Sequence, residues 1–168
     1  MGTNLARKRA RKAQRRKLVV ADKLKAEAAE ASIPARVHRA AGLPLRCCLM
    51  TEALFEAGIG TLILARGTYD AVLAAFLIDL QGPGVKDVSF DRLDRDMFDA
   101  YTETWETVAP MIAIEPGYGR KLLREVVAGS RSIGFAPHRD YAMVELLFGD
   151  VDADACDAVF PFSRGAAA

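Results

Sequence analysis

The chain has 168 residues, of which 51% are hydrophobic and 27% are charged, and its formal net charge at pH 7 is +1. These values are ordinary for one globular domain, so they exclude a wholly disordered protein. The longest apolar run, residues 71–80, already contains Asp79 and is far shorter than the roughly 20 residues that span a bilayer. We therefore expect no transmembrane segment.

The net charge conceals an uneven distribution along the chain. Residues 1–39 hold twelve Lys and Arg against three Asp and Glu, a net charge of +9. Residues 40–168 hold eleven against nineteen, a net charge of −8. Such a division is typical of a basic tail with a polyanionic partner. We predict a basic arm over 1–39, a single α+β domain over 40–160 and an irregular tail over 161–168.

The first seventeen residues are the strongest candidate for a binding segment. Their types favour a helix, but the charges surround any helical wheel and leave no apolar stripe, so we expect this arm to be helical or disordered. It contains no aromatic residue for base stacking, and its charge suits phosphate groups. We predict binding to RNA, DNA or a ribonucleoprotein without base-specific readout; an inert tail, an anionic membrane surface and a transit peptide are alternatives. The predicted nucleic-acid-binding residues are Arg7, Lys8, Arg9, Arg11, Lys12, Arg15, Arg16 and Lys17.

Apolar runs and turn residues predict a small antiparallel sheet. Residues 61–66 and 71–80 are separated by Gly67-Thr-Tyr-Asp70, which is typical of a hairpin, although the second run could also be a buried helix. A third short strand is predicted at Val85–Phe90. Before the hairpin, residues 43–54 are apolar without a clear period, and Thr51 is a candidate N-cap for one short turn.

After residue 90 the pattern becomes helical. Apolar residues recur at three- and four-residue spacing through 91–113, whose other side is acidic. Further helices are predicted at Tyr118–Ser132 and at Tyr141–Phe148, with Asp140 as the N-cap of the last one. This order predicts an α+β fold in which a sheet of two or three antiparallel strands is covered on one face by about three C-terminal helices.

One stretch of polar residues is a candidate active site. Pro137-His-Arg-Asp140 follows Ser130 and Ser132, so a hydrolase-like site would use His138 as base, Asp140 to orient it, and a serine or water as nucleophile. The segment 129–134 misses the Gly-x-Ser-x-Gly spacing of a nucleophile elbow by one residue. A proline-bounded turn capped by Asp140 is the simpler interpretation, and we favour a protein that is not an enzyme.

Two further motifs are incomplete. Gly117-Tyr-Gly-Arg-Lys121 lacks the third glycine of a dinucleotide fingerprint and the Gly-Lys-Ser/Thr ending of a P-loop. The segment 150–154 has the Asp-x-Asp-x-Asp opening of a calcium loop, but Ala155 and Pro161 occupy the positions that need Gly and Glu. We expect no cofactor and no metal site.

The cysteines indicate a reducing compartment. Their number is odd, and Cys47 and Cys48 are adjacent, so their side chains would rarely converge on one metal ion. Together with Cys156 they are predicted to be small apolar thiols of a cytoplasmic protein.

Three segments together resemble a group of uncharacterised bacterial proteins with a basic N-terminus and a Gly-Phe-x-Pro-His-x-Asp-Tyr stretch. They are the Ala/Arg/Lys-rich start, residues 64–66 through 76–80 followed by 84–87, and Ile133–Tyr141. That group has no assigned activity, so the resemblance implies none for this chain. Its C-terminus continues with a Gly/Pro-containing tail, so the ending 162–168 is interpreted as a shortened or frame-altered version.

The leading hypothesis is an accessory protein whose arm binds nucleic acid or a ribonucleoprotein while the domain supplies a second contact. The alternatives are the hydrolase-like enzyme with His138 and Asp140, and a protein-interaction module that pairs through an exposed edge of its sheet.

Overall fold

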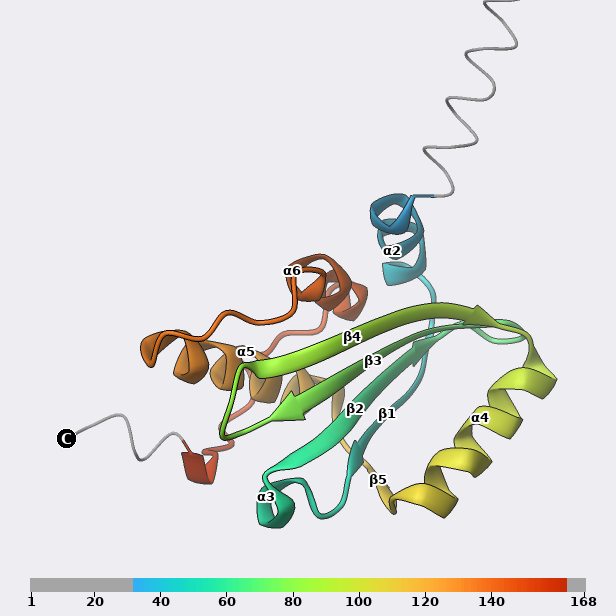
Figure 1. Ribbon diagram of the computed structural model, residues 1–168. Coiled ribbons are helices and arrows are strands. Elements are labelled where there is room, and N and C mark those ends of the chain that lie inside the picture. The colour runs from blue at the N-terminus through green and yellow to red at the C-terminus, as the bar shows by residue number, and fades with distance from the viewer. Residues whose placement is uncertain (1–31, 163–168) are drawn as a thin grey trace, which may run out of the picture. The chain divides into compact units, whose positions relative to one another are not determined.

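The computed structural model describes residues 32–162, so the predicted arm up to residue 31 and the tail beyond residue 162 lie outside the described residues. Its elements form an α+β fold, as predicted (Figure 1). In chain order they are α2 (Ile33–Ala41), β1 (Leu45–Thr51), α3 (Leu54–Ala57), β2 (Ile59–Arg66), β3 (Ala71–Asp79), β4 (Gly84–Leu93), α4 (Arg95–Val108), β5 (Met111–Ala113), α5 (Pro116–Ser132), α6 (Tyr141–Val144) and the 3-10 turn η1 (Glu145–Phe148).

The sheet is larger than the two or three strands predicted. Within the described part of the chain it has five strands, in the order β4-β3-β2-β1-β5, and every neighbouring pair is antiparallel. The predicted hairpin is confirmed as β2 and β3, and the predicted third strand is confirmed as β4. The strands missed are β1, whose apolar residues lack a period, and the three-residue β5, which pairs only with β1.

The tight turn between β2 and β3 depends on a glycine. Gly67 has a φ of +110°, which side chains rarely adopt, and a Cβ added there would lie 2.2 Å from the carbonyl oxygen of Asp70. Its amide also donates to the carbonyl of Pro44 at 2.8 Å, so the turn is tied to the segment that precedes β1.

Gly67→Ala is expected to lower the free energy of unfolding by about 1–3 kcal/mol, because the turn must shift to accept the methyl group. Urea denaturation followed by circular dichroism measures this. The matched control is Gly129→Ala, because Gly129 lies inside α5 with no neighbouring atom within 4 Å of an added Cβ. That change should raise stability by about 0.5–1 kcal/mol, and equal effects of the two would contradict the role given to Gly67.

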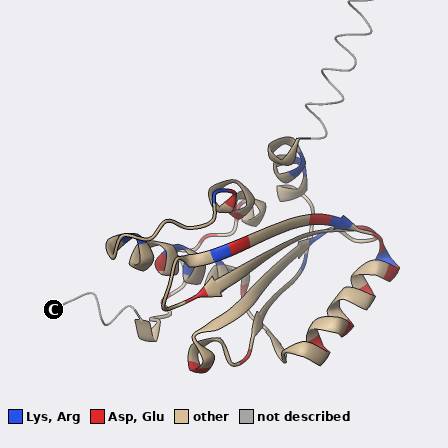
Figure 2. Cartoon of the chain, viewed as in Figure 1, with Lys and Arg blue, Asp and Glu red and all other residues tan. Residues whose placement is uncertain are grey.

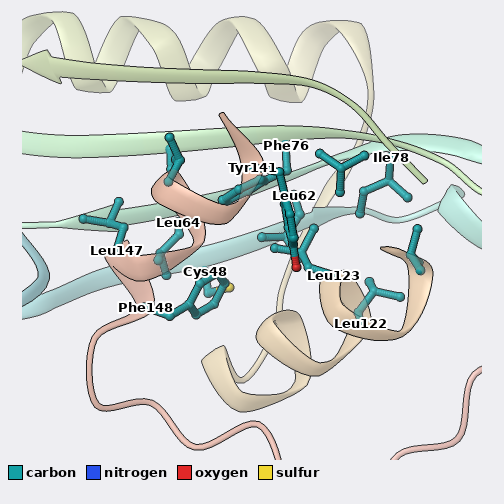
Figure 3. Close-up of a cluster of buried hydrophobic side chains, with 14 of the residues drawn as sticks. Cys48, Leu62, Leu64, Phe76, Ile78, Leu122, Leu123, Tyr141, Leu147 and Phe148 are labelled. Atoms are coloured by element: carbon teal, nitrogen blue, oxygen red, sulfur yellow. The ribbon is translucent and has the colours of Figure 1, made fainter. Parts of the chain in front are cut away.

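Both faces of the sheet are covered, not one as predicted. Alternate residues of β2 point to opposite sides, so Leu62 and Leu64 join one buried cluster while Ile63 and Ala65 join another. The first cluster packs under α5, α6 and η1 and is drawn in Figure 3. The second packs under α4, which lies on the other side of the sheet from α5 in Figure 1.

The acidic helix is shorter than the predicted 91–113. It runs over α4 only, because residues 91–93 complete β4 and residues 111–113 pair with β1 as β5. Asp94 caps the helix by accepting from the amide of Met97 at 2.9 Å. Its apolar side, with Phe98, Tyr101 and Trp105, faces the sheet.

The two later helices match their predictions more closely. α5 begins at Pro116, and its buried face includes Leu122, Leu123, Val126 and Val127. The predicted helix 141–148 is α6 followed at once by η1. No helix within residues 32–162 is both long enough and apolar enough to cross a bilayer, in agreement with the sequence.

Candidate functional site

The predicted site residues divide into two groups. The eight cations of the arm, from Arg7 to Lys17, lie outside the described residues. His138 and Asp140 lie in the segment between α5 and α6, beside β4, which is an edge strand of the sheet. The amide of His138 donates to the carbonyl of Val85 at 2.7 Å, which fixes this segment against the edge.

The imidazole of His138 lies near two carboxylates without a hydrogen bond to either. Its Nδ1 is 3.9 Å from Oδ2 of Asp140, and its Nε2 is 3.8 Å from Oδ1 of Asp87. The backbone amide of Asp140 donates to Nδ1 at 3.3 Å. Because Nδ1 is an acceptor there, it cannot donate to Asp140 in the manner of a catalytic triad. The catalytic assignment stays a prediction, with this geometry as its starting point.

The two candidate nucleophiles, Ser130 and Ser132, make contacts with groups other than His138. Ser132 donates through its hydroxyl to the carbonyl of Gly129 at 2.6 Å, within the last turn of α5. Ser130 is buried, and its Oγ would lie 2.6 Å from a Cβ added at Gly84, so it faces the start of β4. Asp140 occupies the N-cap position of α6, but its side chain makes no capping hydrogen bond.

The polar interior of the domain was missed by the sequence reasoning. Arg120 and Glu145 are 8% and 7% exposed, and they form a two-pronged ion pair at 2.7 and 3.2 Å. Arg124 donates to the same carboxylate at 2.9 Å. Burial alone would raise the pKa of the Glu145 carboxyl, but the hydrogen bonds and charges of Arg120 and Arg124 outweigh it, so that pKa lies below its ordinary value.

A second buried arginine joins distant parts of the chain. Arg66, 4% exposed at the end of β2, donates to the carbonyls of Leu147 at 2.7 Å, Phe148 at 2.5 Å and Leu43 at 2.6 Å. Burial lowers the pKa of its guanidinium, while the carboxylate of Asp150 at 3.9 Å acts in the opposite direction. A signal for this residue was present, since Arg66 shares a strand face with two buried leucines two and four residues earlier.

The incomplete nucleotide-binding motif, residues 117–121, contributes to the fold. Gly119 lets α5 approach the sheet, because a Cβ there would lie 3.0 Å from Sγ of Cys48. Arg120 is engaged with Glu145, and Lys121 donates to the carbonyl of Cys156 at 2.6 Å. The motif's two cations are thus engaged with groups of the domain.

The structure also shows the surroundings of the calcium-like segment 150–154 and of Cys48. Within residues 32–162 no three His, Cys, Asp or Glu side chains are grouped so that they could hold a metal ion. In the calcium-like segment, Asp152 accepts from the amide of Asp154 at 2.9 Å. Cys48 is buried, as predicted for a small apolar thiol, and burial raises its pKa to about 12, with smaller contributions from Cys47 and Glu115. Such a thiol is a poor nucleophile at neutral pH.

The surface charge of the domain differs from region to region (Figure 2). On α4 the acidic side chains Asp96, Asp99, Glu103 and Glu106 are exposed. In Figure 2 the ribbon of α4 is mainly red where it is charged, whereas both blue and red segments occur on α5 and near α6.

Comparisons with protein-family models, with curated proteins and with solved structures find no match for this chain. The resemblance to the bacterial group therefore stays a prediction.

Proposed function

We propose that this chain is an accessory protein that binds nucleic acid or a ribonucleoprotein through its basic N-terminal arm, without base-specific readout. The observation that carries the proposal is the division of charge: a net +9 over residues 1–39 and a net −8 over residues 40–168. Eight cations without an intervening acid form a dense counter-charge for phosphates, and their binding would release condensed counterions.

The acidic surface of the domain supports the proposal that a polyanion contacts the arm. Its exposed carboxylates, such as those on α4, repel a polyanion and so favour contact through the arm. The arm has no Tyr, Phe or Trp, and arginine and lysine contacts to a phosphate backbone carry no sequence information. Binding is therefore expected to depend on charge and salt and little on base sequence.

Removal of residues 1–17 is expected to abolish retention on heparin and to weaken retention on RNA at low salt, because all eight cations of this stretch are lost. Retention is measured by the salt concentration that elutes each protein from the column, and circular dichroism checks that the remaining domain is folded. Equal retention of the truncated and complete chains would contradict the proposal.

A matched control tests whether charge alone matters. In one variant the eight cations become glutamine; in another the first seventeen residues are reordered at constant composition. The reordered arm should bind like the natural one, and the glutamine arm should not bind. Loss of binding by the reordered arm would show a specific motif and contradict readout by charge alone.

A further inference from the structure

An open groove lies between α5 and α6 in the described domain. Two adjoining depressions meet there, and both are lined by Arg131 and Tyr141. One extends over Phe135, His138 and Arg139, and the other extends over Arg124 along α5. We call this surface, defined by Arg124, Arg131, Phe135, His138, Arg139 and Tyr141, the α5–α6 groove.

The groove is positively charged although the domain is acidic. Its one buried carboxylate, Glu145, is shared by Arg120 and Arg124, so these three side chains together keep one net positive charge. Within residues 32–162, Arg131 has no carboxylate within salt-bridge distance, and it is exposed. Arg139 is 3.8 Å from the carboxylate of Asp140, too far for a hydrogen bond.

The groove also presents an aromatic ring. Phe135 is 46% exposed. It follows Gly134, which has a φ of +93° and turns the chain away from α5. The amide of Phe135 donates to the carbonyl of Ser130 at 2.9 Å, so its backbone is held in place. An exposed ring on a fixed backbone beside arginines is the combination on which the bases of a single strand stack.

We propose that the α5–α6 groove binds single-stranded nucleic acid, with Arg124, Arg131 and Arg139 at the phosphates and Phe135 against an unpaired base. This inference rests on the proposed function and deepens it, because it names the form of nucleic acid and the second contact. The groove supplies the aromatic ring that the arm lacks. Three carboxylates near the groove would repel a phosphate: Asp140, Glu145 and Asp87. Their negative charges are offset by the guanidinium groups of Arg120, Arg124, Arg131 and Arg139.

Binding of the complete chain to a fluorescein-labelled oligouridylate of about 20 nucleotides, followed by fluorescence anisotropy, tests the aromatic contact. Phe135→Ala is expected to weaken this binding about tenfold, within the range for loss of one stacked base. Its retention on heparin, which has no bases, should not change. The control is Tyr69→Ala, because Tyr69 is 79% exposed in the β2–β3 turn, away from the groove.

Charge reversal tests the phosphate contacts. Arg131→Glu together with Arg139→Glu should flatten the plot of log affinity against log salt by about 1.4, at roughly 0.7 for each phosphate contact on a single strand. The control, Arg92→Glu in β4 with Arg95→Glu in α4, changes the net charge equally outside the groove and should flatten the plot less.

The outcomes separate this inference from the proposed function. Suppose that Phe135→Ala and the groove charge reversal behave like their controls while removal of the arm abolishes heparin retention. Binding by the groove is then contradicted, and binding through the arm is supported. If the groove variants weaken oligouridylate binding while removal of the arm leaves heparin retention intact, binding through the arm is contradicted and binding by the groove is supported. Equal weakening of a blunt duplex by Phe135→Ala would overturn the contact with an unpaired base.

Discussion

Glu145→Ala is expected to lower the free energy of unfolding by about 3–5 kcal/mol, which is a large part of the stability of a domain of this size. The loss arises because Arg120 would keep its charge in the interior without a carboxylate partner. Arg120 would retain only its hydrogen bonds to the carbonyls of Gly149 and Val151 at 3.0 and 2.6 Å. Urea denaturation at neutral pH measures the difference.

Two variants control for this interpretation. Arg124→Ala removes the other partner of Glu145, but the Arg124 side chain is half-exposed, so the loss should be at most about 1 kcal/mol. Glu145→Gln keeps the shape and tests the charge. If Glu145→Ala costs no more than Arg124→Ala, the buried pair is not the stabilising contact.

The same carboxylate predicts how stability depends on pH. Its pKa in the folded chain lies below the ordinary value of 4.5, so the folded state favours the charged form. The stabilisation is complete above that ordinary value and is lost as the pH falls through the lower, folded pKa. Denaturation midpoints measured from pH 6 downward should fall more steeply for the natural chain than for Glu145→Gln.

Arg66→Met is the second change with a large expected effect, also about 3–5 kcal/mol. Methionine fills much of the same space, but the carbonyls of Leu43, Leu147 and Phe148 would lose their donor. Each buried carbonyl left without a partner costs about 1–3 kcal/mol. Thermal and urea denaturation measure the loss.

Arg66→Lys separates charge from geometry, because one ammonium group cannot reproduce the planar fork of a guanidinium. It should recover only part of the lost stability. Arg92→Met is the control at an exposed arginine, where the effect should stay within about 0.5 kcal/mol. A loss below about 1 kcal/mol for Arg66→Met would contradict the bridging role.

The parts of the fold that sequence could predict have local signals. The β2–β3 hairpin has two apolar runs around a glycine-containing turn, and α5 has a proline at its start and a regular apolar face. The strands β1 and β5 have no such signal. β1 is covered on both faces and so shows no alternation, and β5 is a strand only because β1 lies beside it.

The site was harder to predict because its chemistry depends on distant contacts. Glu145 meets Arg120 and Arg124 across more than twenty residues, so no spacing rule could pair them. Charged side chains are mostly exposed, so nothing in the composition indicates that Arg120 and Glu145 are buried. The ring of Phe135 is exposed because α5 ends at Ser132 and the chain turns at Gly134, whose φ is +93°.

The late position of the covering elements has a consequence for the growing polypeptide. The four large strands are complete at Leu93, but the side chains that cover one face include Phe148 and Phe160, and the latter is synthesised roughly 70 residues later. At about 5–20 residues per second, that apolar face has no complete cover for several seconds during synthesis. The basic arm emerges from the ribosome before any of these elements. During this interval a nascent chain would present its charged arm and an unfinished sheet at the same time, so a polyanion bound early would meet the domain before its core has closed.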